Sequence, residues 1–394
     1  MSAEPRARSM PAMSSAPTHP QADRDSRHAA LALGVALPTD TVLYLLLPMY
    51  ADSFGVTLAQ AGMLLAANRL VRIAGYGWVA RFYARRGDRP TCTLAVLASV
   101  VCALGYATLS GFWLLLPLRL LWGLSFAALN LATQALATAE AAGAARRSGR
   151  SRAFIAMGPV LALPLGALLA QWAGPRAIFV VLAVVALAGL MVVRQLPFNR
   201  HPAVATARRR MKRPNSLDAW SFMEGFTLDG LFVIGLSFLG KDLLPGSAVV
   251  VAGVLLALRY LAEIVLSPVG GRMAERWGAE QLLVSLSLLT CIALLGFGAG
   301  WLWSCAAVIV VLRALQLPLL APIVAHRHPG PERVQALAAR SVWRDIGAGT
   351  GPLAAGLLLP VLPSVWIYGT AALLLALAAL ACGRDAGRLS VQRG

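Results

Sequence analysis

Charged residues are scarce in this sequence, and acidic residues are the scarcer sign. Only 13% of the 394 residues are charged, whereas soluble domains carry about 25%. Hydrophobic residues instead make up 58% of the chain. This composition excludes an ordinary soluble protein and indicates that most of the chain lies in a lipid bilayer.

Cysteine and histidine are also few, with five of each. The cysteines all fall inside apolar stretches, at Cys92, Cys102, Cys291, Cys305 and Cys382. None belongs to a CxxC pair, and none has a histidine nearby at metal-ligand spacing, so we predict no metal site. The sequence also lacks a phosphate-binding loop and a catalytic triad. We therefore expect no cofactor, no enzymatic activity and no ATP-driven mechanism.

The first 28 residues lack the apolar core and the cleavage site of a signal peptide, so the first apolar segment is expected to direct insertion. The net charge is +18, but the basic residues are scattered between apolar segments instead of forming one stripe. Such scattering is typical of membrane topology, and we expect no nucleic acid as a partner.

Twelve segments are long and apolar enough to cross the roughly 30 Å hydrocarbon core, which takes about 20 helical residues. We predict these helices at residues 29–50, 57–81, 91–110, 112–138, 153–172, 176–196, 218–239, 247–270, 280–299, 302–324, 337–359 and 365–382. The predicted fold class is thus an all-α membrane protein of twelve transmembrane helices, with tails at 1–28 and 383–394.

The basic residues predict the orientation, because cytoplasmic segments keep an excess of Arg and Lys. With both termini inside, the cytoplasmic segments hold 27 of the 35 basic residues, and the outer loops hold only Arg176 and Lys241. The other six lie within predicted helices, at Arg69, Arg72, Arg119, Arg259, Arg313 and Arg344. We therefore predict a multi-pass protein of a cell inner membrane with both termini in the cytoplasm.

The middle of the chain, at residues 197–217, is polar, strongly basic and bears proline. It is predicted to be a cytoplasmic linker between two six-helix bundles at 29–196 and 218–382. The alternative is that its basic residues bind anionic lipid.

An internal repeat supports this division. Six landmarks recur in the same order at offsets of 189 to 194 residues. They pair Asp40 with Asp229, Arg69 with Arg259, Ala80 with Gly271, Gly87 with Gly278, Arg119 with Arg313, and Gly158-Pro159 with Gly351-Pro352. Such self-similarity indicates a duplicated architecture.

The loop after the eighth segment carries a recognisable motif. The stretch GGRMAERWGAE at 270–280 has the spacing GxxxDRxG, through Gly271, Glu275, Arg276 and Gly278. It resembles the loop motif of the major facilitator superfamily, where glycine permits close helix approach and the acid meets a helix end or an Arg. The first-half copy, at 74–90, keeps Gly87 and Arg89. It has Ala84 in place of the acid, and Asp88 is the candidate substitute.

Two further motifs strengthen the resemblance. RLLWGLSFA at 119–127 is similar to the family's RxxxGxxxA motif, which implies a part in proton coupling for Arg119. MGPVLALPLG at 157–166 resembles part of its glycine-proline antiporter motif, although Ala162 and Leu163 replace the paired glycines. The resemblance implies two bundles that rock around a central cavity. It also makes Gly158, Pro159, Gly351 and Pro352 points of helix packing and bending.

Charged groups at membrane depth cost about 2.5–3.5 kcal/mol, so they normally face the bundle interior with a partner. Asp40, Asp229 and Glu263 are therefore candidates for proton coupling together with Arg119. The alternative is that they form permanent ion pairs between helices. Glu263, four residues after Arg259, is placed to pair with it. Glu224 is expected to face cytoplasmic water.

Arg69, Arg259 and Arg313 are the candidates for substrate binding, because a guanidinium suits a carboxylate or phosphate. Trp122 and Trp343 are deep enough to stack on an organic substrate, with buried packing as the alternative. Since three acids accompany these arginines, a zwitterionic or weakly acidic metabolite fits better than a simple inorganic anion. The tryptophans near segment ends are expected to be interface anchors, at Trp172, Trp220, Trp277, Trp301 and Trp366.

The predicted function is proton-coupled export of a small organic compound, such as a drug-like molecule, a siderophore or a sugar. We expect a monomer that uses the proton gradient as its energy source. One alternative is uptake of an organic or inorganic anion, which the membrane arginines favour. The other is a non-transporting membrane sensor or assembly factor, which only the altered first-half loop motif supports.

Overall fold

The computed structural model describes residues 19–198, 214–239 and 248–393, and all regular secondary structure in these ranges is helical. The first part contains α1 (His19–Ala36), α2 (Pro38–Met49), η1 (Ala51–Phe54), α3 (Leu58–Arg86), α4 (Asp88–Thr108), α5 (Phe112–Ala137), α6 (Ala144–Trp172) and α7 (Ala177–Val193). The second contains α8 (Ser216–Glu224), the π-helix η2 (Gly225–Leu231), α9 (Phe232–Leu239), α10 (Ala248–Trp277), α11 (Ala279–Gly298), α12 (Leu302–Gln316), α13 (Leu320–Arg327), η4 (Gly330–Glu332), α14 (Arg333–Leu358) and α15 (Ser364–Arg393).

Every predicted segment coincides with a helix or with consecutive helices, but several helices start earlier than predicted. α6 begins at Ala144 instead of residue 153, and α14 begins at Arg333 instead of residue 337. Arg147, predicted in a cytoplasmic loop, and Arg340, counted with the cytoplasmic residues although it falls in the segment predicted at 337–359, both lie inside the fold, with only 2% and 3% of their surface exposed. The hydropathy pattern missed this because a helix continues past the apolar stretch wherever other helices cover its polar end.

Three predicted segments are interrupted helices. The first breaks at Leu37, because Pro38 has no backbone N–H to continue the ladder and instead starts α2. The seventh changes from α-helix to π-helix over Gly225–Leu231, and such widened turns are frequent at functional sites. The tenth divides into α12 and α13 around Pro318.

Eight helices or helix pairs in the described ranges are long and apolar enough to cross a membrane. They run over Pro20–Met49, Asp88–Thr108, Phe112–Ala137, Ala144–Trp172, Ser216–Leu236, Ala279–Gly298, Leu302–Arg327 and Ser364–Asp385. The other four predicted spans correspond to α3, α7, α10 and α14. Two of these, α3 and α14, carry several buried charged or polar side chains. Twelve crossings therefore stay a prediction.

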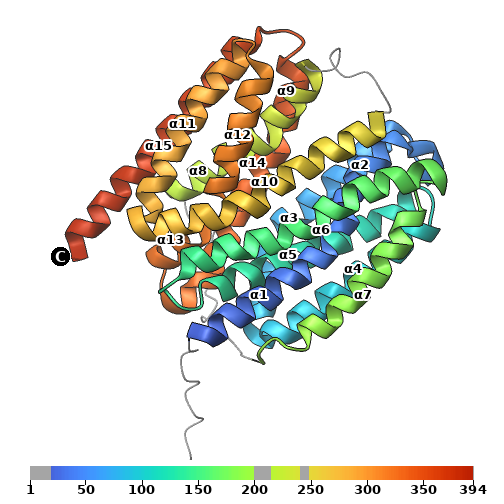
Figure 1. Ribbon diagram of the computed structural model, residues 1–394, viewed down its shortest axis with the longest axis horizontal. Helices are drawn as coiled ribbons and strands as arrows, with labels where there is room; N and C mark the ends of the chain where they lie inside the picture. Colours follow the sequence, from blue (N-terminus) through green and yellow to red (C-terminus); the bar gives the residue numbers. More distant parts are fainter. Residues whose placement is uncertain (1–18, 199–213, 240–247, 394) are drawn as a thin grey trace, which may run out of the picture.

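The helices gather in two groups (Figure 1), with α1–α7 in one and α8, α9 and α11–α15 in the other. The helix α10 lies along α6 at their junction, and α14 packs against α3. Glycines permit the close approach of α6 and α10. A Cβ on Gly149 would stand 2.5 Å from the Ser267 carbonyl oxygen, and one on Gly271 would stand 2.5 Å from that of Ala145. The domain boundaries at 197–217 fall mostly outside the described residues and stay a prediction.

The outer surface is apolar, as expected for a chain surrounded by lipid. Leu161, Val184, Met191 and Leu357 are each exposed by 66% or more. Large exposed apolar surfaces of this kind mark contact with a membrane or a partner.

The aromatic residues near helix ends separate into two kinds. Four predicted interface anchors are exposed, at Trp172, Trp277, Trp301 and Trp366. The prediction for Trp220 is wrong, because its side chain is fully buried and its Nε1–H donates to the Ser287 hydroxyl at 3.0 Å. This indole is satisfied by α11 and not by the membrane–water interface.

Candidate functional site

The first acidic centre lies directly after the break between α1 and α2. Asp40 is in the first turn of α2 and is only 7% exposed. Its Oδ1 accepts a hydrogen bond of 2.5 Å from Nη1 of Arg119, and Asn68 Nδ2 donates to the carboxylate at 3.2 and 3.3 Å. Arg119 is fully buried and also donates from Nε to the Leu64 carbonyl oxygen at 3.1 Å. The two predicted proton-coupling residues of the first half are thus in contact.

The second acidic centre is Asp229, in the π-helix η2. Its Oδ1 accepts from Arg259 at 3.0 Å and from Arg313 at 2.5 Å, and its Oδ2 accepts from Arg344. The widened backbone of Gly225–Leu231 presents this carboxylate to α10, α12 and α14 at once. One carboxylate therefore meets three guanidinium groups, while Asp40 meets one.

Two further acids complete this centre. Glu263 Oε1 accepts from Arg313 at 3.0 Å, so the predicted pairing of Glu263 with Arg259 on one face of α10 is wrong. Glu224 accepts from Arg344 at 3.1 Å, and its side chain is 3% exposed. Its predicted exposure to water is wrong too. Glu263 of α10 thus bonds an arginine of α12, and Glu224 of α8 bonds an arginine of α14.

Charged contacts also join α3 to α14 across the junction of the two groups. Arg72 Nε lies 3.1 Å from Asp345 Oδ2, and the Arg72 guanidinium stacks over the Phe126 ring at 4.6 Å. Arg69, one turn earlier, donates to the Ala348 carbonyl oxygen. The sequence had not paired Arg72 with Asp345, because nothing in the spacing of either helix shows which helix it faces.

The predicted substrate residues Arg69 and Arg259 have different immediate partners. Arg259 contacts Asp229, and its side chain is 27% exposed. The charge of Arg69 also acts on Asp229, from the opposite group of helices. Trp122 is fully buried in the apolar core, whereas Trp343 is half-buried on α14. The structure therefore brings the two arginines around one carboxylate without placing them in direct contact.

The charges at this depth do not balance within the two centres and the α3–α14 junction. Five acids are present, at Asp40, Glu224, Asp229, Glu263 and Asp345. Six arginines accompany them, at Arg69, Arg72, Arg119, Arg259, Arg313 and Arg344. The one arginine here that contacts a carbonyl oxygen instead of a carboxylate is Arg69. The site thus holds one net positive charge if every acid is ionised.

Repeat-related glycines pack beside both acidic centres. A Cβ on Gly158 of α6 would collide with the Gly34 carbonyl oxygen of α1. A Cβ on Gly351 of α14 would collide with the Phe226 carbonyl oxygen and stand 2.7 Å from the Cα of Gly230. Pro159 and Pro352 follow directly inside these helices. Gly158 therefore lets α6 approach α1 shortly before the break that precedes Asp40. Gly351 lets α14 approach the π-helix that carries Asp229.

The two loop motifs share their backbone shape. Gly87 has φ 84° and Gly278 has φ 83°, a region that favours glycine, and each separates two consecutive helices. In the first motif, the fully buried Asp88 starts α4 and accepts from the Tyr83 hydroxyl. Arg89 stacks over the Phe198 ring at 5.4 Å.

The acid of the second loop motif meets a helix start. Glu275 Oε1 lies 3.9 Å from where a Cβ on Gly143 would stand, immediately before α6 begins. Arg276 is exposed. A carboxylate beside the N-terminal end of a helix is favoured by the helix dipole.

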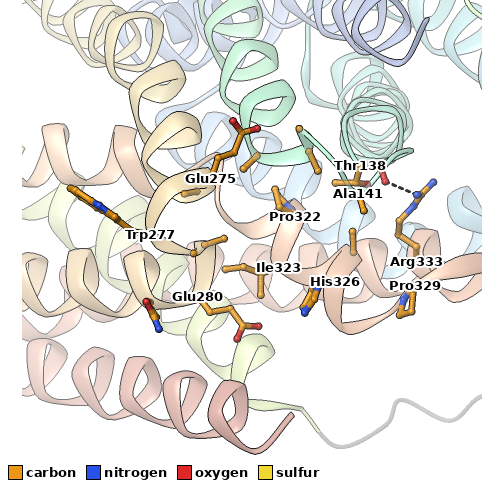
Figure 2. Close-up of a pocket in the computed structure, with 18 of the residues that line it drawn as sticks. Thr138, Ala141, Glu275, Trp277, Glu280, Pro322, Ile323, His326, Pro329 and Arg333 are labelled. Carbon is orange, nitrogen blue, oxygen red and sulfur yellow. Dashed lines mark hydrogen bonds between the residues drawn. The ribbon is translucent and has the colours of Figure 1, made fainter. Parts of the chain in front are cut away.

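A pocket of ≈ 930 Å³ opens at the same end of the molecule (Figure 2). Its lining includes Glu275, Glu280, His326 and Arg333, and Arg333 Nη1 donates to the Thr138 carbonyl oxygen at 2.5 Å. None of its lining residues belongs to the acidic centres. This pocket is distinct from the charged site at membrane depth.

Comparison with known proteins identifies the class. The family model of the Major Facilitator Superfamily matches residues 29–240 and 221–386, so the chain belongs to that superfamily. The crystal structure of the human organic anion transporter MFSD10 (TETRAN) matches with a TM-score of 0.76 at 18% identity. The match covers 92% of this chain and 100% of that one, and it shows the same fold. Comparison with curated protein sequences found no match.

Membership of this superfamily has direct consequences. The chain is a multi-pass membrane protein, and the family and the matching transporter structure point to a transporter rather than an enzyme. A transporter of this family binds a small-molecule substrate within the membrane.

Proposed function

We propose that this chain is a proton-coupled secondary transporter of a small organic compound that carries an acidic group. The observation that carries this proposal is the surplus of arginine at membrane depth. Among the described residues of the two centres and the α3–α14 junction, six arginines share five acids, and Arg69 donates to a carbonyl oxygen instead of a carboxylate. A substrate carboxylate would supply the missing negative charge and a matching planar partner for the guanidinium. The human protein with the matching structure is an organic anion transporter, which favours the same class.

Proton coupling is assigned to Asp40 before Asp229. Protonation of Asp40 gives up one ion pair, with Arg119, and leaves the amide of Asn68 as a partner. Protonation of Asp229 gives up three ion pairs. Because unpaired buried guanidinium groups are costly, we assign the coupling role to Asp40, whose protonation breaks the smaller number of ion pairs. Glu263 and Arg313 then serve to hold the second centre together.

For the direction of transport, export has the support of the partial antiporter motif at Gly158-Pro159, which packs directly on Gly34 beside Asp40. Uptake of an anion is the second candidate, and the same surplus arginine supports it. In either direction we propose twelve crossings of a cell inner membrane, both termini in the cytoplasm and a monomeric unit. The uneven distribution of arginine supports this orientation.

The test is counterflow with the purified full chain in proteoliposomes. Vesicles are loaded with one compound from a panel of small organic acids and matched neutral analogues, and entry of the labelled compound is followed. We expect counterflow for one or more acids, and none for the neutral analogue of the same compound. Equal counterflow of the acid and its neutral analogue would overturn the acidic-substrate proposal. Separate vesicles with an imposed pH gradient of either sign then report whether net movement is import or export.

A further inference from the structure

A second polar site lies between the two groups of helices, apart from the acidic centres. A small, partly open cavity of ≈ 20 Å³ is lined by α5, α6, α13, α14 and the α12–α13 connection. Its polar lining includes Asn130, Gln134, Ser148, Arg152 and Arg340. A volume of this size holds about one water-sized particle, and a cavity with such a lining is not an apolar packing defect.

The polar atoms around this cavity lack partners among the described residues. Arg340 is 3% exposed, and neither its Nε nor its Nη1 has a hydrogen-bond partner. The same is true of both amide atoms of Gln134 and of the Ser148 hydroxyl. Buried polar groups in native proteins are nearly always bonded, so several unbonded groups around one cavity indicate an occupant.

The two charged side chains that line the cavity, Arg152 and Arg340, are both positive. Arg152 and Arg340 repel each other, and Arg344 repels both. Glu263 and Glu224 attract Arg152, and Glu224 attracts Arg340, but no acid forms an ion pair with either arginine in the described chain. Glu224 and Glu263 are bonded to Arg344 and Arg313. The buried guanidinium of Arg340 and the half-buried one of Arg152, without a bonded counterion, carry a large desolvation cost.

We infer that this cavity binds one small monovalent inorganic anion of about the size of chloride. The guanidinium groups of Arg340 and Arg152 supply the charge, and the Gln134 amide and the Ser148 hydroxyl supply neutral donors. A space of ≈ 20 Å³ favours a single small anion over phosphate, sulfate or the body of an organic substrate. The anion would join α5 and α6 of one group to α14 of the other. None of the residues that line this cavity is a proposed substrate or coupling residue.

Halide-dependent stability of the purified full chain tests the inference. The protein is exchanged into sodium gluconate, and chloride or bromide is titrated in at constant ionic strength while the melting temperature is followed. We expect a saturable rise of several degrees for both halides and none for added gluconate. Bromide soaked into crystals should give an anomalous peak in the cavity.

Two variants decide whether the response belongs to this site. Arg340→Gln should abolish the halide response, and Arg152→Gln, at a half-buried position, should weaken it even where Arg340→Gln fails to fold. The exposed Arg85→Gln keeps the full response. A melting temperature that does not change with halide concentration, or a halide response in Arg152→Gln equal to that of the unaltered chain, would overturn the proposal. Stabilisation by small organic acids in place of halides would assign the cavity to a substrate carboxylate and would overturn it as well.

Discussion

At the scale of single residues, the two repeat-related acids differ in how many cations hold them. Asp229 is bonded to Arg259, Arg313 and Arg344. Asp229→Asn would leave these guanidinium groups with too little negative charge, so we expect a loss of about 3–5 kcal/mol in stability. The measurement is thermal unfolding and membrane yield, with Asp52→Asn as the control at an exposed position. Unchanged stability would show that this cluster is not what holds α10, α12 and α14 together.

Arg69 is the arginine whose role in substrate binding is most open to test. Arg69→Lys keeps the charge but loses the planar fork, so the affinity for an acidic substrate should fall by about 1–3 kcal/mol. Expression and melting temperature should stay near those of the unaltered chain. Equilibrium binding to purified protein, with a substrate found by counterflow, measures the change. Unaltered affinity would make Arg69 a helix-locking residue.

The sequence named Asp40, Asp229 and Arg119 as candidates through the repeat and the motifs, and their part in proton coupling stays a prediction. The match of Asp40 with Asp229 singled out both acids, and Arg119 does contact Asp40. Arg344 and Glu224 were not predicted as site residues, because their contacts with the second centre depend on how α8 and α14 pack. Spacing along one helix carries no information about which neighbouring helix a side chain faces.

At the scale of elements, glycine contacts determine how closely the helices around the acids approach. Gly351→Ala places a Cβ against the Phe226 carbonyl oxygen, so we expect a loss of about 1–3 kcal/mol in stability and reduced transport. Gly349→Ala, on the same helix, meets nothing within 4 Å and should be neutral or slightly stabilising. Thermal unfolding of the two variants side by side tests this difference. Equal melting temperatures would contradict the packing account.

Helix positions were predictable, while breaks and ends were not. Each segment predicted from hydropathy coincides with a helix or with consecutive helices, and eight of these are long and apolar enough to cross a bilayer. Hydropathy did not show the π-helix at Gly225–Leu231, because it does not distinguish a π-helical turn from an α-helical one. It also placed the start of α6 nine residues late, because the polar first turns are buried by other helices and not by lipid.

At the scale of the whole molecule, the proposed orientation predicts which loops face each side. A reporter inserted after Gly330, between α13 and α14, should give a cytoplasmic signal. A reporter after Gly300, between α11 and α12, should give an outside signal. Both positions are glycines with open space around them, so insertion is tolerated. The same signal from both sites would contradict the topology.

We propose that proton movement is coupled to substrate movement through Asp40, and simultaneous recording of the proton flux and the substrate flux tests this coupling. Proteoliposomes with a pH-sensitive dye inside receive an acidic substrate, and internal pH and substrate entry are followed together. In vesicles with the unaltered chain, the internal pH should change as the substrate enters. Asp40→Asn should keep counterflow exchange, since the amide preserves size and hydrogen bonding, but should lose proton movement and all gradient-driven accumulation. Proton-coupled accumulation that survives in Asp40→Asn would contradict the account.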